Sequence, residues 1–182
     1  MKKFLIVVGI VILLIIGALV LFIQNTKSAS PEADVNFNSG DLSVNIFYNR
    51  PSKRGREIFG GLVPYGKVWR TGANEATVFE TNKDLIINGK TLKSGKYSLW
   101  ALPNPQSWTI IFNSEYGQWG INFNGEANRD SKNDVVTVDA PVLIQDKEFE
   151  QFTISVEKAG EELELIFIWD KTLVAVPFTI AR

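Results

Sequence analysis

An unbroken apolar run near the start of the chain restricts the fold more than any other feature of the sequence. Residues 4–23 are twenty consecutive apolar or small residues without a single charge. At about 1.5 Å per residue, a helix of this length spans roughly 30 Å, which is the thickness of a bilayer core. We therefore expect a single N-terminal transmembrane helix over residues 1–23.

The residues on either side of the apolar run favour an uncleaved anchor. A secretory signal peptide has a shorter apolar region, of about 7–15 residues, and ends in a small-x-small cleavage site. The nearest match is Ser28-Ala29-Ser30, which Pro31 follows directly. We expect a single-pass protein of the inner (cytoplasmic) membrane, with secretion after signal cleavage as the alternative. Lys2 and Lys3 favour a cytoplasmic N-terminus and an extracytoplasmic, periplasmic remainder.

The residues after the apolar run are enough for one domain. We divide the chain into the anchor, a linker over residues 24–34 and a single β domain over residues 35–182. About 150 residues is the usual size of a domain with an adequate core. The 19 basic and 20 acidic residues are nearly balanced. This balance gives no reason to expect nucleic acid or an anionic bilayer surface as a partner.

Apolar and polar residues alternate along most of the remaining chain. Phe152, Ile154 and Val156 alternate with polar residues, and residues 162–170 have the same period of two, which is typical of half-buried strands. Further strands are predicted at residues 42–48, 76–81, 84–88, 96–102, 107–113, 134–140 and 172–180. Many short strands with polar turns predict an all-β fold, an antiparallel β-sandwich or a partly closed barrel.

Turn residues agree with this map of strands. Asn88-Gly89 lies between two apolar runs, which is the strongest short-range signal for a two-residue hairpin. Asp170-Lys171 is predicted to separate two further strands. Pro177 lacks a backbone donor, so we expect the last strand to lie at an edge or to carry a bulge.

The composition excludes several kinds of chemistry. The chain has no His and no Cys, which removes Ser-His-Asp and Cys-His nucleophiles, His-bearing zinc sites, disulfides and lipid attachment through Cys. Neither common nucleotide-binding loop is present. Residues 122–134 are rich in oxygen ligands but lack the order of an EF-hand loop, so a polar surface loop is expected there. We therefore predict no cofactor and no metal.

A polar turn, RTGANE at residues 70–75, raises a choice between structure and function. Residues 71–74 contain a Gly and an Asn, which tolerate positive φ, and fit a four-residue hairpin loop. Arg70 and Glu75 then close the loop. In the structural interpretation they form a cross-strand ion pair that fixes the register of the two strands.

In the functional interpretation the same turn binds a ligand. Arg70 donates to a carboxylate, a phosphate or a sugar hydroxyl, Asn74 donates and accepts, and Glu75 accepts. Trp69 is a candidate wall of this site, and Arg56 a candidate second positive edge. Further wall candidates are Trp100, Trp108 and Trp119. Trp in a β-sandwich more often belongs to the core, so both roles stay open for these residues.

Several segments resemble one protein family. They are residues 56–66, residues 69–75, Ser94-Gly95-Lys96-Tyr97-Ser98-Leu99 and Gln118-Trp119-Gly120. Together they are similar to the bacterial domain-of-unknown-function 2911 family, over about residues 42–180. The resemblance implies an exported, mostly β domain with an Arg-Thr-Gly-Ala-Asn signature. Family members often carry a cleavable or lipidated signal, whereas this chain has a long apolar run and no Cys.

Three hypotheses for function follow. We favour a non-enzymatic, membrane-anchored module that binds a small molecule or a glycan at Arg70, Asn74 and Glu75. The first alternative is a carboxylate-based hydrolase or lyase acting on envelope glycans, with Glu75 or Glu80 as one of two acids. The odd spacing of those two residues places them on opposite faces of a regular strand, which weighs against their acting together. The second alternative is a structural or interaction protein of the cell envelope.

Overall fold

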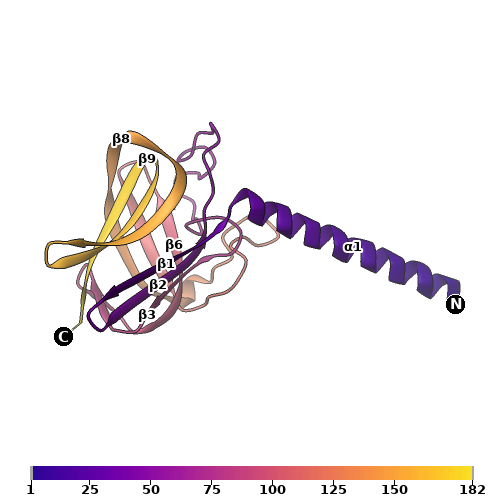
Figure 1. Cartoon of the computed structure of the whole chain (residues 1–182), viewed down its shortest axis with the longest axis horizontal. Helices are drawn as coiled ribbons and strands as arrows, with labels where there is room; N and C mark the ends of the chain where they lie inside the picture. Colours follow the sequence, from indigo (N-terminus) through magenta and orange to yellow (C-terminus); the bar gives the residue numbers. More distant parts are fainter. Residues whose placement is uncertain (1, 182) are drawn as a thin grey trace.

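A single long helix projects from a β domain in the computed structural model, which describes residues 2–181 (Figure 1). The helix, α1, covers Lys2–Ala29. It is long and apolar enough to cross a membrane, a property that a signal sequence shares. Its apolar side chains are exposed on all sides through most of its length. A helix that is apolar all round and uncovered by protein needs an apolar surrounding.

The helix continues beyond the apolar run and ends at the domain. Residues 24–29 form its last turns, Ser30 and Pro31 follow, and the first strand begins at Glu32. The segment expected as a linker is thus mostly helix and strand. Ile23, Thr26 and Lys27 are partly covered, and their spacing places them on one face of the helix, toward the domain.

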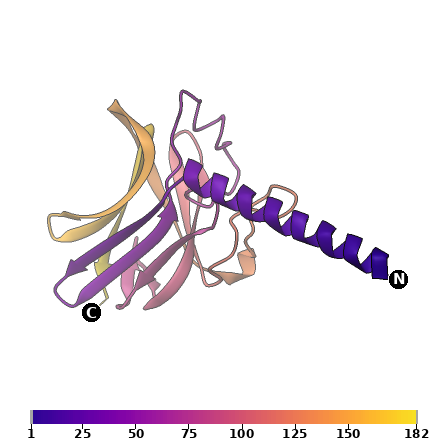
Figure 2. The ribbon, with the colours of Figure 1, turned by 45° about the vertical axis from the view of Figure 1, so that its right-hand side comes forward.

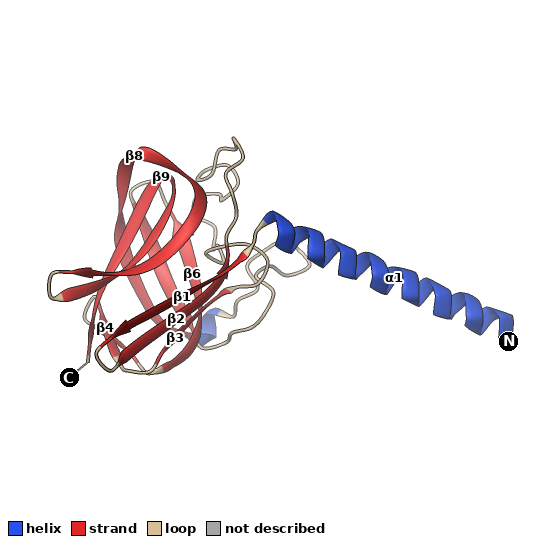
Figure 3. Cartoon of the chain, viewed as in Figure 1, coloured by secondary structure: helices blue, strands red, loops and turns tan. Residues whose placement is uncertain are grey.

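Nine strands form the β domain (Figure 3). Their bounds are β1 Glu32–Ser39, β2 Leu42–Asn49, β3 Thr77–Thr81, β4 Leu85–Ile87, β5 Lys90–Leu92, β6 Gly95–Pro103, β7 Ser107–Asn113, β8 Asp134–Ala159 and β9 Glu162–Ile180. A short 3-10 helix, η1 (Ser131–Asn133), precedes β8. The strand order is β1-β2-β3-β6-β7-β8-β9-β4-β5, with antiparallel pairing between neighbours.

The long strand β8 joins two groups of strands, β1-β2-β3-β6-β7 on one side and β9-β4-β5 on the other. Its first part, to Pro141, pairs with β7, and residues from Val142 onward pair with β9. The end strands β1 and β5 do not pair with each other, so the sheet is open. The prediction of an all-β, sandwich-like domain preceded by one apolar helix is confirmed.

Most local predictions hold, and the exceptions have a physical cause. Asn88 and Gly89 have φ of 45° and 75° and join β4 to β5 as a two-residue hairpin, as predicted. The turn expected at Asp170-Lys171 is wrong, because β9 runs through it. Asp170 has φ of 53° and pairs with Phe149 at a register shift, so the signal marks an irregularity within a strand. Strand β1 was not predicted.

Aromatic rings fill the centre of the domain. Trp69, Trp108 and Trp169 are all buried there with Phe59 and Phe152. The rings of Trp69 and Trp169 stack with centroids 6.1 Å apart and planes 20° apart. Such a cluster contributes area burial and favourable ring geometry to stability. Trp69 is therefore a core residue, and it fixes the position of Arg70, the next residue along the chain.

Candidate functional site

The polar turn at residues 70–75 is held to the domain at both ends. Trp69 and Ala101 exchange backbone hydrogen bonds of 2.7 and 2.9 Å. The Thr71 hydroxyl donates to the carbonyl of Leu99 at 2.8 Å, and the Thr77 hydroxyl donates to the carbonyl of Thr71 at 2.7 Å. These bonds to β6 and β3 leave the turn little freedom, so its side chains have fixed directions.

Arg70 and Glu75 do not form the closing pair. Among residues 2–181, no ion pair involves Arg70. Glu75 instead accepts from Asn49 Nδ2 at 3.0 Å and lies 3.0 Å from Lys27 Nζ. The expected hairpin loop is absent because Trp69 bridges to Ala101 and Glu75 bridges to Trp119, so the residues beside the turn have different neighbours.

Asn74 and Glu75 contact the end of the helix. The Asn74 side chain is 6% exposed, and its Nδ2 lies 3.2 Å from Asn49 Oδ1 and 3.4 Å from the carbonyl of Thr26. Lys27 pairs with Glu75 and, at 2.6 Å, with Glu32. The Thr26 carbonyl also accepts from the backbone N–H of Ser30 at 3.1 Å, so the Asn74 amide is a second donor to this carbonyl in the last turn of α1.

The charge of Glu75 is favoured by its neighbours. Partial burial acts to raise the pKa of this carboxyl group, but the hydrogen bond and charge of Lys27, together with the Asn49 amide, outweigh burial and lower the pKa overall. Glu75 is therefore ionised at neutral pH and engaged on the helix side of the turn. It does not line either of the two cavities described below.

Arg70 extends in another direction and lacks a carboxylate partner. Its aliphatic part packs on Gly120, where an added Cβ would lie 1.8 Å from Arg70 Cδ. Within the described chain, Arg70 Nε is buried without a hydrogen-bond partner. Burial lowers the pKa of this guanidinium, which nevertheless stays charged because arginine is not deprotonated in proteins. Arg70 is thus a half-buried cation whose Nε donor is buried and unused.

The larger of two cavities at Arg70 has a volume of about 530 Å³. This volume is within the range of small-molecule sites. Its lining comes from the segment before the polar turn and from the connection between β7 and β8. The lining residues are Leu62, Val63, Pro64, Lys67, Val68, Trp69, Arg70, Gly120, Ile121, Gly125, Glu126, Ala127 and Arg129.

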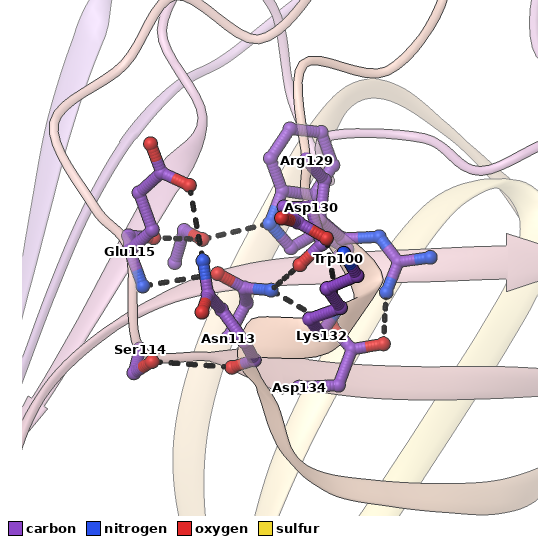
Figure 4. A network of polar contacts seen from close by, with 10 residues as sticks. Trp100, Asn113, Ser114, Glu115, Arg129, Asp130, Lys132 and Asp134 are labelled. Atoms are coloured by element: carbon purple, nitrogen blue, oxygen red, sulfur yellow. Dashed lines mark hydrogen bonds and ion pairs between the residues drawn. The ribbon is translucent and has the colours of Figure 1, made fainter.

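Arg70 and Lys67 are the cations in this lining that form no ion pair with the other described residues, and Arg70 is the more buried of the two. Arg129 forms an ion pair with Asp134, which also accepts from Asn113 Nδ2 at 2.8 Å (Figure 4). Lys67 is exposed at the rim, where water screens its charge. Glu126 contributes one negative charge. The local balance therefore favours an anion placed against the guanidinium of Arg70.

A smaller cavity, of about 220 Å³, lies on another side of Arg70. The structure brings Arg56 to this cavity together with Arg70. The Arg56 guanidinium donates to the carbonyls of Lys53, at 3.0 Å, and Ser52, at 2.6 Å. Two of its five N–H donors are thus already used by backbone oxygens.

The structure separates the five residues that the sequence grouped as a site. Arg70 and Trp69 line both cavities, Arg56 lines the smaller one, and Asn74 and Glu75 face the helix. Trp100, Trp108 and Trp119 line neither of the two. Sequence reasoning missed Gly120, which makes room for Arg70, and Lys67 and Arg129. The Gln118-Trp119-Gly120 segment was recognised as a motif, but its contact with Arg70 depends on folding.

The structure offers no metal site in the part of the chain that it describes. No group of three or more Asp and Glu side chains is placed to hold an ion within residues 2–181. In the loop before β8, Asn122 Oδ1 accepts from the backbone of Asn124 and Glu126, at 2.9 and 3.1 Å. Asp130 accepts from the backbone of Lys132 and caps η1. These oxygens serve the loop itself.

The chain belongs to the family described as protein of unknown function (DUF2911), whose model matches residues 30–178. The match covers nearly all of the β domain and begins where α1 ends, which confirms the family identified from the sequence. No curated protein and no solved structure matches the chain.

Proposed function

We propose that this protein is a membrane-anchored binding module that takes a carboxylate-bearing small molecule in the cavity at Arg70. The observation that carries the proposal is the guanidinium itself, which is half-buried, has a buried Nε without a partner, and forms no ion pair with the other described residues. Burying an uncompensated charge costs several kcal/mol in the absence of a partner. A bound anion offsets that cost.

Arginine suits this role better than the other cations of the domain. Its planar fork donates two parallel hydrogen bonds to a carboxylate, and the rigid packing on Gly120 orients the fork in advance. Preorganised donors lose less entropy on binding than flexible ones. A lysine at the rim, such as Lys67, adds long-range attraction for the same anion.

The rest of the cavity favours a ligand with an apolar body. Leu62, Val68, Ile121 and Ala127 line the same cavity as Arg70, and Trp69 contributes part of the wall. Apolar walls with a few polar groups are typical of small-molecule sites. We therefore infer a ligand with one carboxylate on a compact apolar or ring-shaped body. A sugar acid satisfies this description, whereas a neutral sugar leaves the guanidinium without a charged partner.

The enzymatic alternative has less support. Glu75 is engaged by Lys27 and Asn49, and Glu80 forms an ion pair with Lys96 at 3.0 Å. Neither acid lines the cavity at Arg70, where Glu126 is the acidic lining residue. Glycoside hydrolysis needs two carboxyl groups about 5–9.5 Å apart across one cleft. The cavity lining provides one.

We further propose that α1 is retained as an anchor, with its N-terminus in the cytoplasm and the β domain outside. The contacts of Lys27 with Glu75 and of Thr26 with Asn74 support retention, because cleavage near Ser28-Ala29-Ser30 removes both. The N-terminal lysines support the orientation. An intact mass measured on protein from the membrane fraction tests retention, since a processed chain lacks about 29 residues.

Matched pairs of small molecules test the ligand class. We would titrate the full chain, in detergent, with benzoate against benzyl alcohol and with glucuronate against glucose, and follow the heat of binding and the melting temperature. We expect the acid of each pair to bind and the neutral partner to bind much more weakly. A response equal for acid and neutral partner in both pairs would overturn the proposed class.

Substitution of Arg70 ties any binding to the cavity. Arg70→Met removes a charge-assisted interaction of about 1.5–3 kcal/mol, which is about a ten- to hundred-fold loss of affinity. Arg70→Lys keeps the charge but not the fork and should retain intermediate affinity. The control is Lys90→Met, which removes one exposed charge on β5, outside both cavities. If Arg70→Met and Lys90→Met bind the acids equally well, the site is elsewhere.

A further inference from the structure

An exposed aromatic ring stands beside the anchor. Phe123 lies in the connection between β7 and η1, residues 114–130, which we call the Phe123 loop, and its side chain is fully exposed. Tyr116 and Ile121 of the same loop are 53% and 36% exposed. A Phe side chain left in water forgoes about 1.5–3 kcal/mol of burial free energy. Three exposed large apolar side chains in one loop need a covering surface.

The Phe123 loop presents this ring on an ordered tip. The backbone N–H of Asn122 donates to the carbonyl of Glu126 at 2.8 Å, and the Asn122 carbonyl accepts from the N–H of Gly125 at 3.0 Å. Ile121 and Ala127 form a bridge below this turn. At the root of the loop, Asn113 donates to the carbonyl of Asp130 at 2.8 Å, within the polar network of Figure 4. The ring is therefore held outward by local structure.

The middle of the Phe123 loop, at Gly120, lies next to the end of α1. The backbone of Gly120 donates to the carbonyl of Asn74 at 2.9 Å, and the Asn74 side chain lies 3.4 Å from the carbonyl of Thr26. One residue thus separates the loop from the helix. Figures 1 and 2, which view the domain from directions 45° apart, both place this loop alongside the C-terminal end of α1.

The length of α1 defines the depth of that end relative to a bilayer. The apolar run to Ile23 is long enough for the roughly 30 Å hydrocarbon core, and the polar residues 24–28 follow directly. Thr26 therefore lies in the headgroup region when α1 spans the membrane. Gly120 of the Phe123 loop is joined to Thr26 through Asn74, which brings this part of the loop close to the same depth.

We propose that the Phe123 loop inserts Phe123 into the interface of the bilayer that α1 crosses. The partner is a lipid surface, and the proposal rests on the retention of α1 and not on a ligand at Arg70. Aromatic and apolar side chains at the ends of an anchor are favoured in this interfacial region. The loop then acts as a second contact that fixes the tilt of the β domain. Residues 120–121 and 125–127 of the loop also line the larger cavity, whose rim consequently lies near the headgroups.

The absence of native cysteine makes the test direct. Single cysteines at Asn124, Asp41 and Leu13 would carry an environment-sensitive fluorophore in the full chain, with one chain per lipid nanodisc. Lipids brominated near the headgroup or in mid-chain then report depth by quenching. Asp41 is the control because it follows β1, an eight-residue strand that leads about 26 Å away from the helix end.

We expect headgroup-brominated lipids to quench the label at N124C severalfold more than the label at D41C. Phe123→Ser in the N124C background should reduce that quenching toward the D41C value, with no change in melting temperature because the ring makes no buried contact. Quenching of N124C equal to that of D41C, or unaffected by Phe123→Ser, would overturn the proposal.

The L13C label separates this proposal from that of the anchor. Mid-chain bromine should quench L13C strongly. If it does so while N124C resembles D41C, α1 is inserted and the loop contact is wrong. If L13C is not quenched, both proposals fail. Self-quenching of N124C that depends on a second chain in the disc, without quenching by lipid, would assign the exposed ring to a dimer contact instead.

Discussion

Arg70 and Glu75 lie five positions apart in one turn, yet their surroundings are opposite. The Glu75 carboxylate has a lysine and an amide within hydrogen-bond distance, and Asn74 beside it donates to the Thr26 carbonyl in the last turn of α1. The Arg70 guanidinium lies at a cavity, with a buried Nε that has no partner among the described residues. The polar groups at the Glu75 end of the turn thus have partners within the protein, whereas Arg70 at the other end retains a buried donor without one.

This contrast shows how one signature can serve two purposes. Groups with complete sets of partners hold the structure together, and their loss is expected to lower stability without changing binding. A charged group held without a partner costs stability and is retained in many proteins because function needs it. The comparison therefore predicts opposite patterns of stability and binding for substitutions at the two ends of the turn.

Gly120→Ala should have the largest effect, because it disturbs the cavity end directly. An added Cβ overlaps Arg70 Cδ at 1.8 Å and approaches Arg70 Cβ and Cγ at 2.9 Å. Overpacking of this kind costs about 1–3 kcal/mol and displaces the guanidinium. We expect a lower melting temperature together with a loss of carboxylate binding comparable to that of Arg70→Met.

A double-mutant cycle checks the cause of this effect. In an Arg70→Ala background the clashing Cγ and Cδ are gone, so Gly120→Ala should cost clearly less than in the wild type. Gly40→Asn is the control for a glycine in an open turn, where an added side chain meets no atom within 4 Å. Equal costs of Gly120→Ala in both backgrounds would show that Arg70 does not occupy the space at Gly120.

Asn49→Ala should affect stability alone. Asn49 is fully buried, donates to Glu75 at 3.0 Å and accepts from Asn74 at 3.2 Å. Its removal leaves buried polar groups with fewer partners, at a cost of about 1–3 kcal/mol. Thermal unfolding and titration with benzoate would be measured on the same sample. A large loss of affinity in folded Asn49→Ala would contradict the separation of the two ends.

The smallest effect is a dependence of the Glu75 contribution on pH. Because the folded-state pKa of Glu75 is lowered, its contribution to stability is present above the ordinary value of 4.5 and is lost as the pH falls through the lowered value. The pair with Lys27 is partly exposed, so we expect less than about 1 kcal/mol. The difference in stability between wild type and Glu75→Gln should therefore shrink from pH 7 to pH 3.

The comparison with Glu75→Gln removes other acid-dependent contributions. Hydrogen bonds from Lys83 and Lys93 lower the pKa values of Asp41 and Asp84, respectively, and both effects are present in the two proteins. They cancel in the difference. A difference that stays constant from pH 7 to pH 3 would mean that ionised Glu75 does not stabilise the end of the helix.

The secondary structure was largely predictable because its signals are local. The Asn88-Gly89 hairpin needs positive φ at both residues, and that requirement is visible in the residue types themselves. Asp170-Lys171 gave a similar local signal, but continuous pairing of β8 with β9 turned it into an irregularity within one strand. Strand β1 was missed although its sequence carries a local signal, because Ala33, Val35 and Phe37 alternate with polar residues and pack against the core.

By itself, the sequence determined an apolar helix followed by an all-β domain of one family, because periodicity, turn chemistry and motif order are properties of neighbouring residues. Only the tertiary structure decided which residues each polar side chain of the turn contacts. Glu75 meets Lys27, 48 positions earlier in the chain, and Arg70 packs on Gly120, 50 positions later. Contacts between such distant residues depend on how the strands pair and pack, which no local pattern specifies.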